Sequence, residues 1–183
     1  GSINLGSSSL TTNQTADTTF SGNISGTGGL NLNQIGSATY SPTLSGTNTY
    51  TGSTMLLNYG WLKLNGDASM SDSSAVRVNG NSVLTLQSDQ TIGSLASNSA
   101  TASIQLGSYT LTSGGDNTST SVSGVVSGTG PLVQQGSGTL EHAAAPKTTE
   151  QAPFQDSEVR KITPPATPQP PATKQQAPKA AVA

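Results

Sequence analysis

The side chains able to carry out acid–base or metal chemistry are few in this chain and lie far apart. Residues 1–140 contain no glutamate and no histidine, and the single histidine of the chain is His142. The chain has no cysteine, so thiolate metal sites and disulfides are excluded. The carboxylates of residues 1–140 are five aspartates, namely Asp17, Asp67, Asp72, Asp89 and Asp116.

This distribution does not favour catalysis. Cleavage of a polysaccharide needs two carboxylates on either side of the scissile bond, or carboxylates that hold a metal beside a basic residue. The five aspartates are isolated in the sequence, although coiling of the chain could bring Asp67 and Asp89 together. We therefore expect that the protein is not an enzyme.

Four of these aspartates, Asp67, Asp72, Asp89 and Asp116, are weak candidates for a calcium site. They lack the repeated GGxGxD pattern that places calcium ligands at successive corners of a coiled chain. Aspartate is also common in turns, where its carboxylate accepts hydrogen bonds from local backbone N–H groups, a few residues away in sequence. We interpret these aspartates as turn residues and expect no metal and no cofactor.

Tyr59 and Trp61 are the candidates for a surface contact. Leu62 and Leu64 alternate with polar residues and should face a core, so Trp61 should point outward beside Lys63, with Tyr59 on the same face. Exposed aromatic pairs often mark contact surfaces. Two interpretations remain open: contact with a partner, a glycan or a second copy of the chain, and packing under a corner loop.

The elements that position these residues are predicted by the alternation of apolar and polar residues. Alternation with a period of two predicts short strands with one buried face. Several of these strands end at glycine or Asn-Gly, which supply the positive φ of a corner. We find no apolar stripe of helical period. The clearest alternating segments are residues 3–5, 30–32, 62–64, 76–78, 84–86 and 104–106.

A long internal repeat indicates how these strands are arranged. Residues 21–30 (SGNISGTGGL) recur 102 residues later as 123–132 (SGVVSGTGPL), and residues 1–7 recur as 102–108. Short strands need further partners to bury their apolar face, which a sandwich or a solenoid could provide. The repeat favours an all-β, right-handed parallel β-helix, in which each turn stacks on the last. With roughly 20–25 residues per turn, residues 1–140 should form about six turns.

The composition changes near Leu140. All 21 glycines lie at or before Gly138, and eight of the ten prolines lie at or after Pro146. We predict a β-helix over residues 1–140, made of one repeat (1–101) and part of the next (102–140). Residues 141–183 should form a disordered linker or tail rich in Pro and Ala, without regular strands or helices.

Several segments resemble a known family. The segments LSGTNTYTGST (44–54) and LNYGWLKLNG (57–66) are similar to the passenger-associated transport repeat of bacterial autotransporters. GDNTST (115–120), SGVVSGTG (123–130) and QGSGTL (135–140) resemble it too. The resemblance covers nearly all of residues 1–140 and implies a β-helical passenger that is secreted or displayed on the bacterial surface. It also implies export by an outer-membrane barrel domain that this chain lacks. Tyr59 and Trp61 stand where that repeat usually carries small residues.

This resemblance leads to three functional hypotheses. The first is a structural and adhesive segment, a surface-displayed stalk that promotes contact between bacterial cells or between bacterium and host. The second is a module that assists folding and export of the passenger, and the third is a β-helical enzyme acting on polysaccharides. We expect self-association or contact with a host surface or glycan. With a net charge of −3 over residues 1–140, we expect no nucleic-acid partner.

Overall fold

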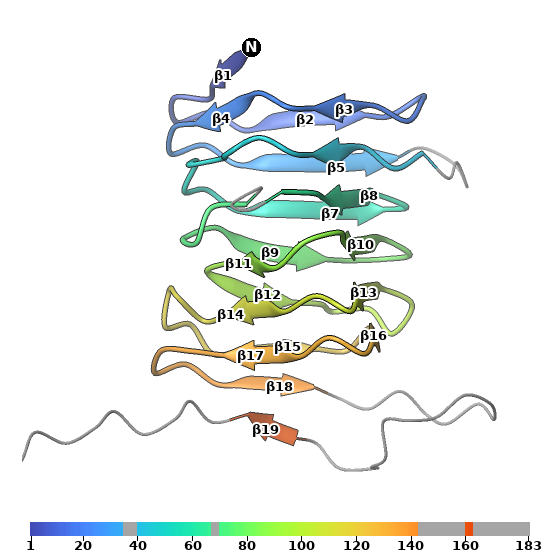
Figure 1. The fold of residues 1–183 in the computed structure, drawn as a ribbon, viewed down its shortest axis with the longest axis vertical. Helices are drawn as coiled ribbons and strands as arrows, with labels where there is room; N and C mark the ends of the chain where they lie inside the picture. Colours follow the sequence, from blue (N-terminus) through green and yellow to red (C-terminus); the bar gives the residue numbers. More distant parts are fainter. Residues whose placement is uncertain (35–39, 67–69, 143–159, 163–183) are drawn as a thin grey trace, which may run out of the picture.

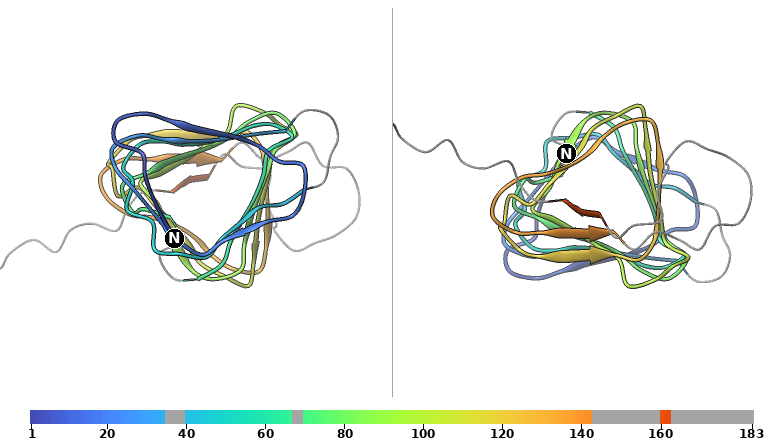
Figure 2. Two further views of the ribbon diagram at one scale, coloured as in Figure 1. Left: turned by 90° about the horizontal axis from the view of Figure 1, so that it is seen from above. Right: turned by 90° about the horizontal axis from the view of Figure 1, so that it is seen from below.

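A computed structural model describes residues 1–34, 40–66, 70–142 and 160–162. Over these residues the chain winds into a parallel β-solenoid of about six turns, stacked along one long axis (Figure 1). Viewed along that axis the coil has a three-sided outline (Figure 2). Every regular element of the described residues is a strand. These residues therefore include no helix that is long and apolar enough to span a membrane.

The first face carries one strand from each turn. Five of them form a parallel sheet, which continues through a single bridge between Ser97 and Val122 into two further strands. Aligned residues of neighbouring turns are 19 (Ala75 to Ser94) to 25 (Ser97 to Val122) residues apart. The strands are β2 (Leu10–Asn13), β5 (Leu30–Gln34), β7 (Thr54–Asn58), β9 (Ala75–Val78), β12 (Ser94–Ala96), β15 (Thr120–Val122) and β18 (Leu140–His142).

The second face is an uninterrupted parallel sheet of six strands. Its register aligns large apolar residues through four turns, with Phe20 followed by three leucines, Leu44, Leu64 and Leu86. The strands are β3 (Thr19–Phe20), β6 (Thr43–Leu44), β8 (Trp61–Leu64), β10 (Val83–Leu86), β13 (Ser103–Gly107) and β16 (Val125–Gly128).

The third face has strands only towards its two ends. Its middle part is formed by irregular segments, which still bond to neighbouring turns: Thr49 N–H donates to Ile24 O at 2.8 Å, and Gly93 N–H donates to Ser74 O at 3.0 Å. The strands are β1 (Ser2–Asn4), β4 (Asn23–Ser25), β11 (Gln90–Thr91), β14 (Leu111–Ser113) and β17 (Leu132–Gln134).

The core consists of columns of apolar side chains that run along the axis of the coil. Leu62, Leu84 and Ile104 occupy one register row of the second face and are fully buried. The residues between them in sequence point outward and are polar or half-buried, which is the alternation expected of short strands. Burial of these columns is the main apolar contribution to stability.

The corners explain why SGTG is the best-preserved part of the repeat. In the first copy, Thr27 and Gly28 both donate their N–H groups to Gly6 O, at 2.7 and 2.9 Å. In the second copy, Thr129 and Gly130 donate in the same way to Gly107 O, at 2.6 and 2.9 Å. The accepting glycine has a positive φ in both corners, +56° and +61°. The repeated motif therefore joins successive turns at a corner.

The two copies of the repeat lie on different faces of the coil. β1 and β4 lie on the third face, whereas their sequence copies β13 and β16 lie on the second face. Likewise β5 lies on the first face and its copy β17 on the third. From a residue of the first copy to its equivalent in the second, the chain completes four and two-thirds turns of the coil. The second copy is therefore displaced by one face relative to the first. A repeated sequence does not imply a repeated orientation in this solenoid.

The predicted parallel β-helix is confirmed for the described residues, and each predicted alternating segment falls within or beside a strand. Two details of the predicted boundary differ. β18 ends at His142, so the solenoid continues past residue 140. β19 (Arg160–Ile162) pairs antiparallel with β18, although we expected no regular strand in the tail. Residues 154–163 contain no proline, which leaves the N–H groups of β19 free to bond. The rest of the tail, 143–159 and 163–183, lies outside the described residues, so its expected disorder is untested.

We expect one added methyl group in the SGTG corner to lower the stability of the fold. A Cβ at Gly130 would lie 1.9 Å from Tyr109 O in the previous turn, so Gly130→Ala must push two turns apart. We expect a loss of about 1–3 kcal/mol in the free energy of unfolding, as for other overpacked sites. Urea denaturation measures it. Ser108→Ala, at an exposed position of the same corner, is the control and should change stability by less than about 0.5 kcal/mol. Equal stability of both variants would contradict this account of the corner.

Candidate functional site

Three aspartates, Asp17, Asp89 and Asp116, accept hydrogen bonds from backbone N–H or hydroxyl groups. Asp17 accepts hydrogen bonds from Ser41 N–H (2.7 Å) and Ser41 Oγ (3.3 Å). Asp89 accepts one from Thr110 N–H at 2.8 Å, and Asp116 accepts from Thr118 N–H at 2.9 Å and from Ser94 Oγ at 2.7 Å. The hydrogen bond from Ser41 N–H lowers the pKa of Asp17. Asp116 caps the nearby backbone N–H of Thr118, as predicted. Asp89 and Asp17 instead accept hydrogen bonds from residues one turn of the coil away, 21 and 24 residues along the chain.

Titratable side chains do not gather into a metal or acid–base site in the described part of the chain. Within residues 1–34, 40–66, 70–142 and 160–162, no three His, Asp or Glu side chains form a group suited to a metal ion. Asp67 lies outside the described residues, so the pairing of Asp67 with Asp89 is not tested. His142 Nε2 lies 3.1 Å from Gly124 O, a backbone contact at the last turn.

The two aromatic candidates lie together at the corner between the first and second faces. Tyr59 follows β7 and is 41% exposed. Trp61 opens β8 and is half-buried, and its flanking partner Leu62 is fully buried, so Trp61 points outward as predicted. Asn58, with φ of 60°, turns the chain at this corner. The structure therefore leaves Tyr59 accessible and holds Trp61 partly against the sheet.

Trp61 is fixed by a chain of side-chain hydrogen bonds across three turns. Its indole N–H donates to Thr85 Oγ1 at 3.2 Å, and Thr85 in turn donates to Gln105 Oε1 at 3.0 Å. On the same face Trp61 stands beside Val83 in the register of β8 and β10. This is a rigid aromatic side chain on a polar sheet surface, an arrangement that suits contact at low entropic cost.

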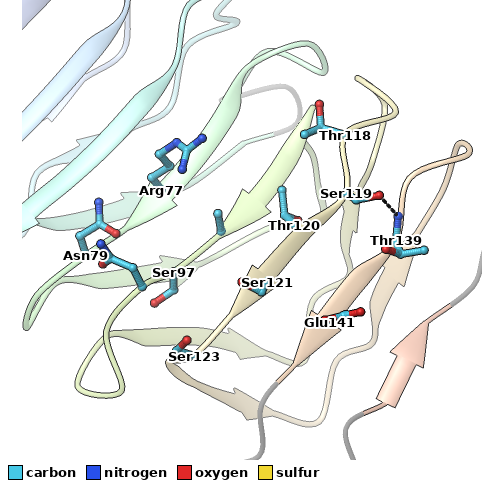
Figure 3. A pocket seen from close by; sticks show the side chains of 12 residues that line it. Arg77, Asn79, Ser97, Thr118, Ser119, Thr120, Ser121, Ser123, Thr139 and Glu141 are labelled. Carbon is cyan, nitrogen blue, oxygen red and sulfur yellow. Dashed lines mark hydrogen bonds between the residues drawn. The ribbon is translucent and has the colours of Figure 1, made fainter.

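A second candidate surface is a polar hollow of about 670 Å³ on the first face (Figure 3). It spans β9, β12, β15 and β18, with Arg77 at the β9 side and Glu141 at the β18 side. Hydroxyl groups line the space between them, including those of Ser97, Ser121 and Ser123. We call this surface the serine hollow.

The serine hollow lies where the sheet of the first face narrows to a single bridge. Among the described residues, β12 and β15 meet at a single bridge, Ser97 beside Val122, across the longest spacing between turns of that face. Ser97 N–H donates to Ser121 O and Ser123 N–H donates to Ser97 O, both at 3.0 Å. The register places Arg77 beside Ala96, and Ser121 beside Glu141, in one outward row. With turns about 4.8 Å apart, the backbones of Arg77 and Glu141 are separated by roughly 14 Å.

The chemistry available in the serine hollow is hydrogen bonding. Its lining, taken over the described residues, holds one carboxylate, one guanidinium and several hydroxyl and amide groups, but neither a histidine nor a second carboxylate. Such a lining can orient a polar ligand, but it contains no serine activated by a neighbouring base. Sequence reasoning missed the hollow, because its residues come from four turns and only the coil brings them together.

Among the described residues, the titratable group with the most strongly shifted pKa lies in the core. Tyr50 is fully buried, and its hydroxyl lies 2.5 Å from Thr54 Oγ1 and 3.4 Å from Met70 Sδ. Burial raises the pKa of Tyr50 to about 12. Ser74 Oγ extends this buried cluster by donating to Gly52 O at 2.7 Å. A perturbed pKa often marks a reactive site, but here the tyrosine is sealed from solvent and serves the packing of the third face.

Comparison with known proteins found no matching family model, no similar curated protein and no similar solved structure.

Because the pKa of Tyr50 is raised in the folded protein, we expect the protein to lose stability at alkaline pH. The folded protein holds Tyr50 neutral up to about pH 12, whereas an unfolded tyrosine ionises near pH 10. The stabilising contribution of the neutral form is thus complete below pH 10 and is lost between about pH 10 and pH 12. We expect the stability advantage of the wild type over Tyr50→Phe to fall by on the order of 2 kcal/mol over that range. Unfolding midpoints of both proteins against pH test this, and a difference that does not change with pH would contradict it.

Proposed function

We propose that the chain is a structural and adhesive segment of a bacterial autotransporter passenger, a stalk displayed at the cell surface or secreted. The observation that carries the proposal is the form of the molecule. It is a stiff coil with a closed apolar core and an outer surface of hydroxyl and amide groups. The resemblance of residues 44–66 and 115–140 to passenger-associated transport repeats supports the same assignment.

Stiffness follows from how the turns are joined. Strand pairs run between neighbouring turns on all three faces, and corner hydrogen bonds such as Thr27 N–H to Gly6 O add further links. Each turn contacts only the turns beside it, so length can be changed without altering the cross-section. A rod of this kind holds a binding surface away from the membrane to which, on our proposal, its parent protein is anchored.

The proposed mechanism of adhesion is weak contact repeated along the rod. Tyr59 and Trp61 provide one aromatic contact point, and the serine hollow between Arg77 and Glu141 provides a polar one. Single weak contacts become strong when many rods on two surfaces engage together. We propose a second copy, a host surface or a glycan as the partner. We propose no catalytic activity and no nucleic-acid partner.

A second candidate is a module that assists the folding and export of the passenger. The solenoid favours this role because each folded turn presents a strand edge to the next segment of the chain. For example, Leu30 in β5 bonds through its N–H to Ser53 O of the following turn at 2.9 Å. A stable stack can therefore serve as the template on which later turns fold. Deletion of this segment from the full-length parent separates the two roles, since loss of surface display indicates the folding module and loss of adhesion alone indicates the adhesin.

The aromatic corner gives the sharpest test of adhesion. We expect the double variant Tyr59→Ser, Trp61→Thr to bind bacterial cells, host cells or matrix at least about tenfold more weakly, the loss typical of an aromatic contact residue. Binding of the labelled chain to each surface measures it. Tyr109→Ser is the matched control, because Tyr109 is a comparably exposed tyrosine at a different corner. It should bind like the wild type.

Two outcomes would overturn the adhesive proposal. If the wild type binds none of these surfaces, the stalk role alone remains. If the wild type binds and the double variant binds equally well, the contact lies elsewhere on the rod. Circular dichroism of each variant confirms that the solenoid is intact before binding is compared.

A further inference from the structure

We infer that the serine hollow binds a short carbohydrate that carries one carboxylate, and that Arg77 holds this carboxylate. The inference rests on the proposed adhesive function, because it names the class of glycan that this face of the rod takes. The hollow measures about 670 Å³, within the roughly 300–1,000 Å³ typical of small-molecule sites. It therefore has room for a short oligosaccharide.

The hollow results from the sizes of the side chains in one outward row of the first face. The strand register places Arg77 beside Ala96, and Ser121 beside Glu141. The bridge between β12 and β15 joins these two pairs by placing Ala96 beside Ser121. Two short side chains thus lie between two long ones, with Arg77 and Glu141 on opposite sides of the hollow (Figure 3).

Arg77 is the residue of the hollow that selects an anion. It is exposed, and among the described residues its side chain makes no hydrogen bond and no ion pair. A guanidinium presents its N–H donors in a planar fork, which matches a carboxylate through two parallel hydrogen bonds. The second cation of residues 1–140, Lys63, lies in β8 on the second face, away from the hollow.

The charges of the hollow decide how the ligand is oriented. Glu141 lies on the side opposite Arg77 and repels a negative charge placed near it. One guanidinium balances one negative charge, so a carboxylate suits the hollow better than a phosphate monoester, which carries about two. The carboxylate of the ligand therefore lies at Arg77, and its uncharged part extends towards Glu141.

The rest of the lining suits the hydroxyl groups of a sugar. Among the described residues, Ala96 is the only apolar residue that lines the hollow, so no pocket takes the apolar side chain of a peptide. Asn98, Ser121 and Ser123 provide amide and hydroxyl groups, which both donate and accept hydrogen bonds. Within the described part of the chain, the side chains of Asn98 and Ser121 have no hydrogen-bond partner. The ligand is therefore a carbohydrate rather than a peptide.

Titration calorimetry with a matched pair of trisaccharides tests the inference. One trisaccharide ends in glucuronate, and the other has glucose in its place. We expect the wild type to bind the acidic trisaccharide at least about tenfold more tightly, the difference typical of hydrogen bonds to a charged group. Equal binding of the two, or binding of neither, would overturn the inference. Tighter binding of the same trisaccharide ending in glucose 6-phosphate would overturn it as well.

Variants of the two cations locate the site. Arg77→Gln should lose the preference for the acidic trisaccharide, and Arg77→Lys should keep only part of it, since an ammonium lacks the planar fork. Lys63→Gln is the matched control, because it removes the same charge from the second face, and it should bind like the wild type. If Arg77→Gln keeps the preference, or if Lys63→Gln loses it to the same extent, the inference is wrong.

A further variant tests the hollow itself. Ser121→Leu places a larger, apolar side chain in the middle of the row and leaves Arg77 unchanged, so it should weaken binding of both trisaccharides. Thr112→Leu, in β14 on the third face, is its matched control and should bind like the wild type. Circular dichroism confirms that each variant keeps the solenoid. Unchanged binding by a folded Ser121→Leu variant would place the ligand outside the hollow and contradict the inference.

Failure of this inference and failure of the proposed function are distinguishable. If the chain binds cells or matrix through Tyr59 and Trp61 but does not bind the acidic trisaccharide, the inference alone is overturned. If the chain binds the acidic trisaccharide through Arg77 but binds no cell or matrix, the inference is supported and the adhesive proposal is overturned.

Discussion

The structure depends on the hydrogen bonds and apolar contacts that each turn makes with the turns beside it. A strand of two to five residues cannot bury its backbone or its leucines alone, and in this chain its partner is always about one turn away in sequence. Leu84 is buried because Leu62 and Ile104 lie on either side of it. Among the described residues, Ile3 and Val126 each have a strand partner on one side only, and both are partly exposed.

That constraint acts on the corners as strongly as on the faces. Gly6 and Gly107 take a positive φ, and the carbonyl of each accepts two N–H groups from the SGTG corner of the next turn. The motif serves in this way at two corners that are rotated relative to each other by one face. What the repeat preserves is therefore a way of joining turns. The outer surface is free to vary, and it is there that Tyr59, Trp61 and the serine hollow occur.

For residues of the outer surface, the sequence predicts which way a side chain points but not which residue of a neighbouring turn it contacts. Trp61 could be placed outward from the alternation with Leu62 and Leu64, because strand side chains alternate strictly. The hydrogen bond from Trp61 to Thr85 could not be predicted from the sequence, since that pairing depends on the register between β8 and β10. Asp89 was predicted to cap a local backbone N–H group, but its partner Thr110 is 21 residues away, because the number of residues in one turn of the coil decides which residues become neighbours.

The sequence by itself predicted the alternating strands, the glycine corners and the solenoid, because alternation and glycine placement are local properties and the repeat favours stacked turns. Short strands such as β6 and β11 were not predicted. It did not determine the end of the solenoid at His142 or the pairing of β19 with β18. Only the tertiary structure showed that the repeat advances by four turns and two thirds, and that Arg77 and Glu141 lie along one hollow. The reason is physical: turn lengths vary from 19 to 25 residues, and small differences summed over several turns decide which residues become neighbours.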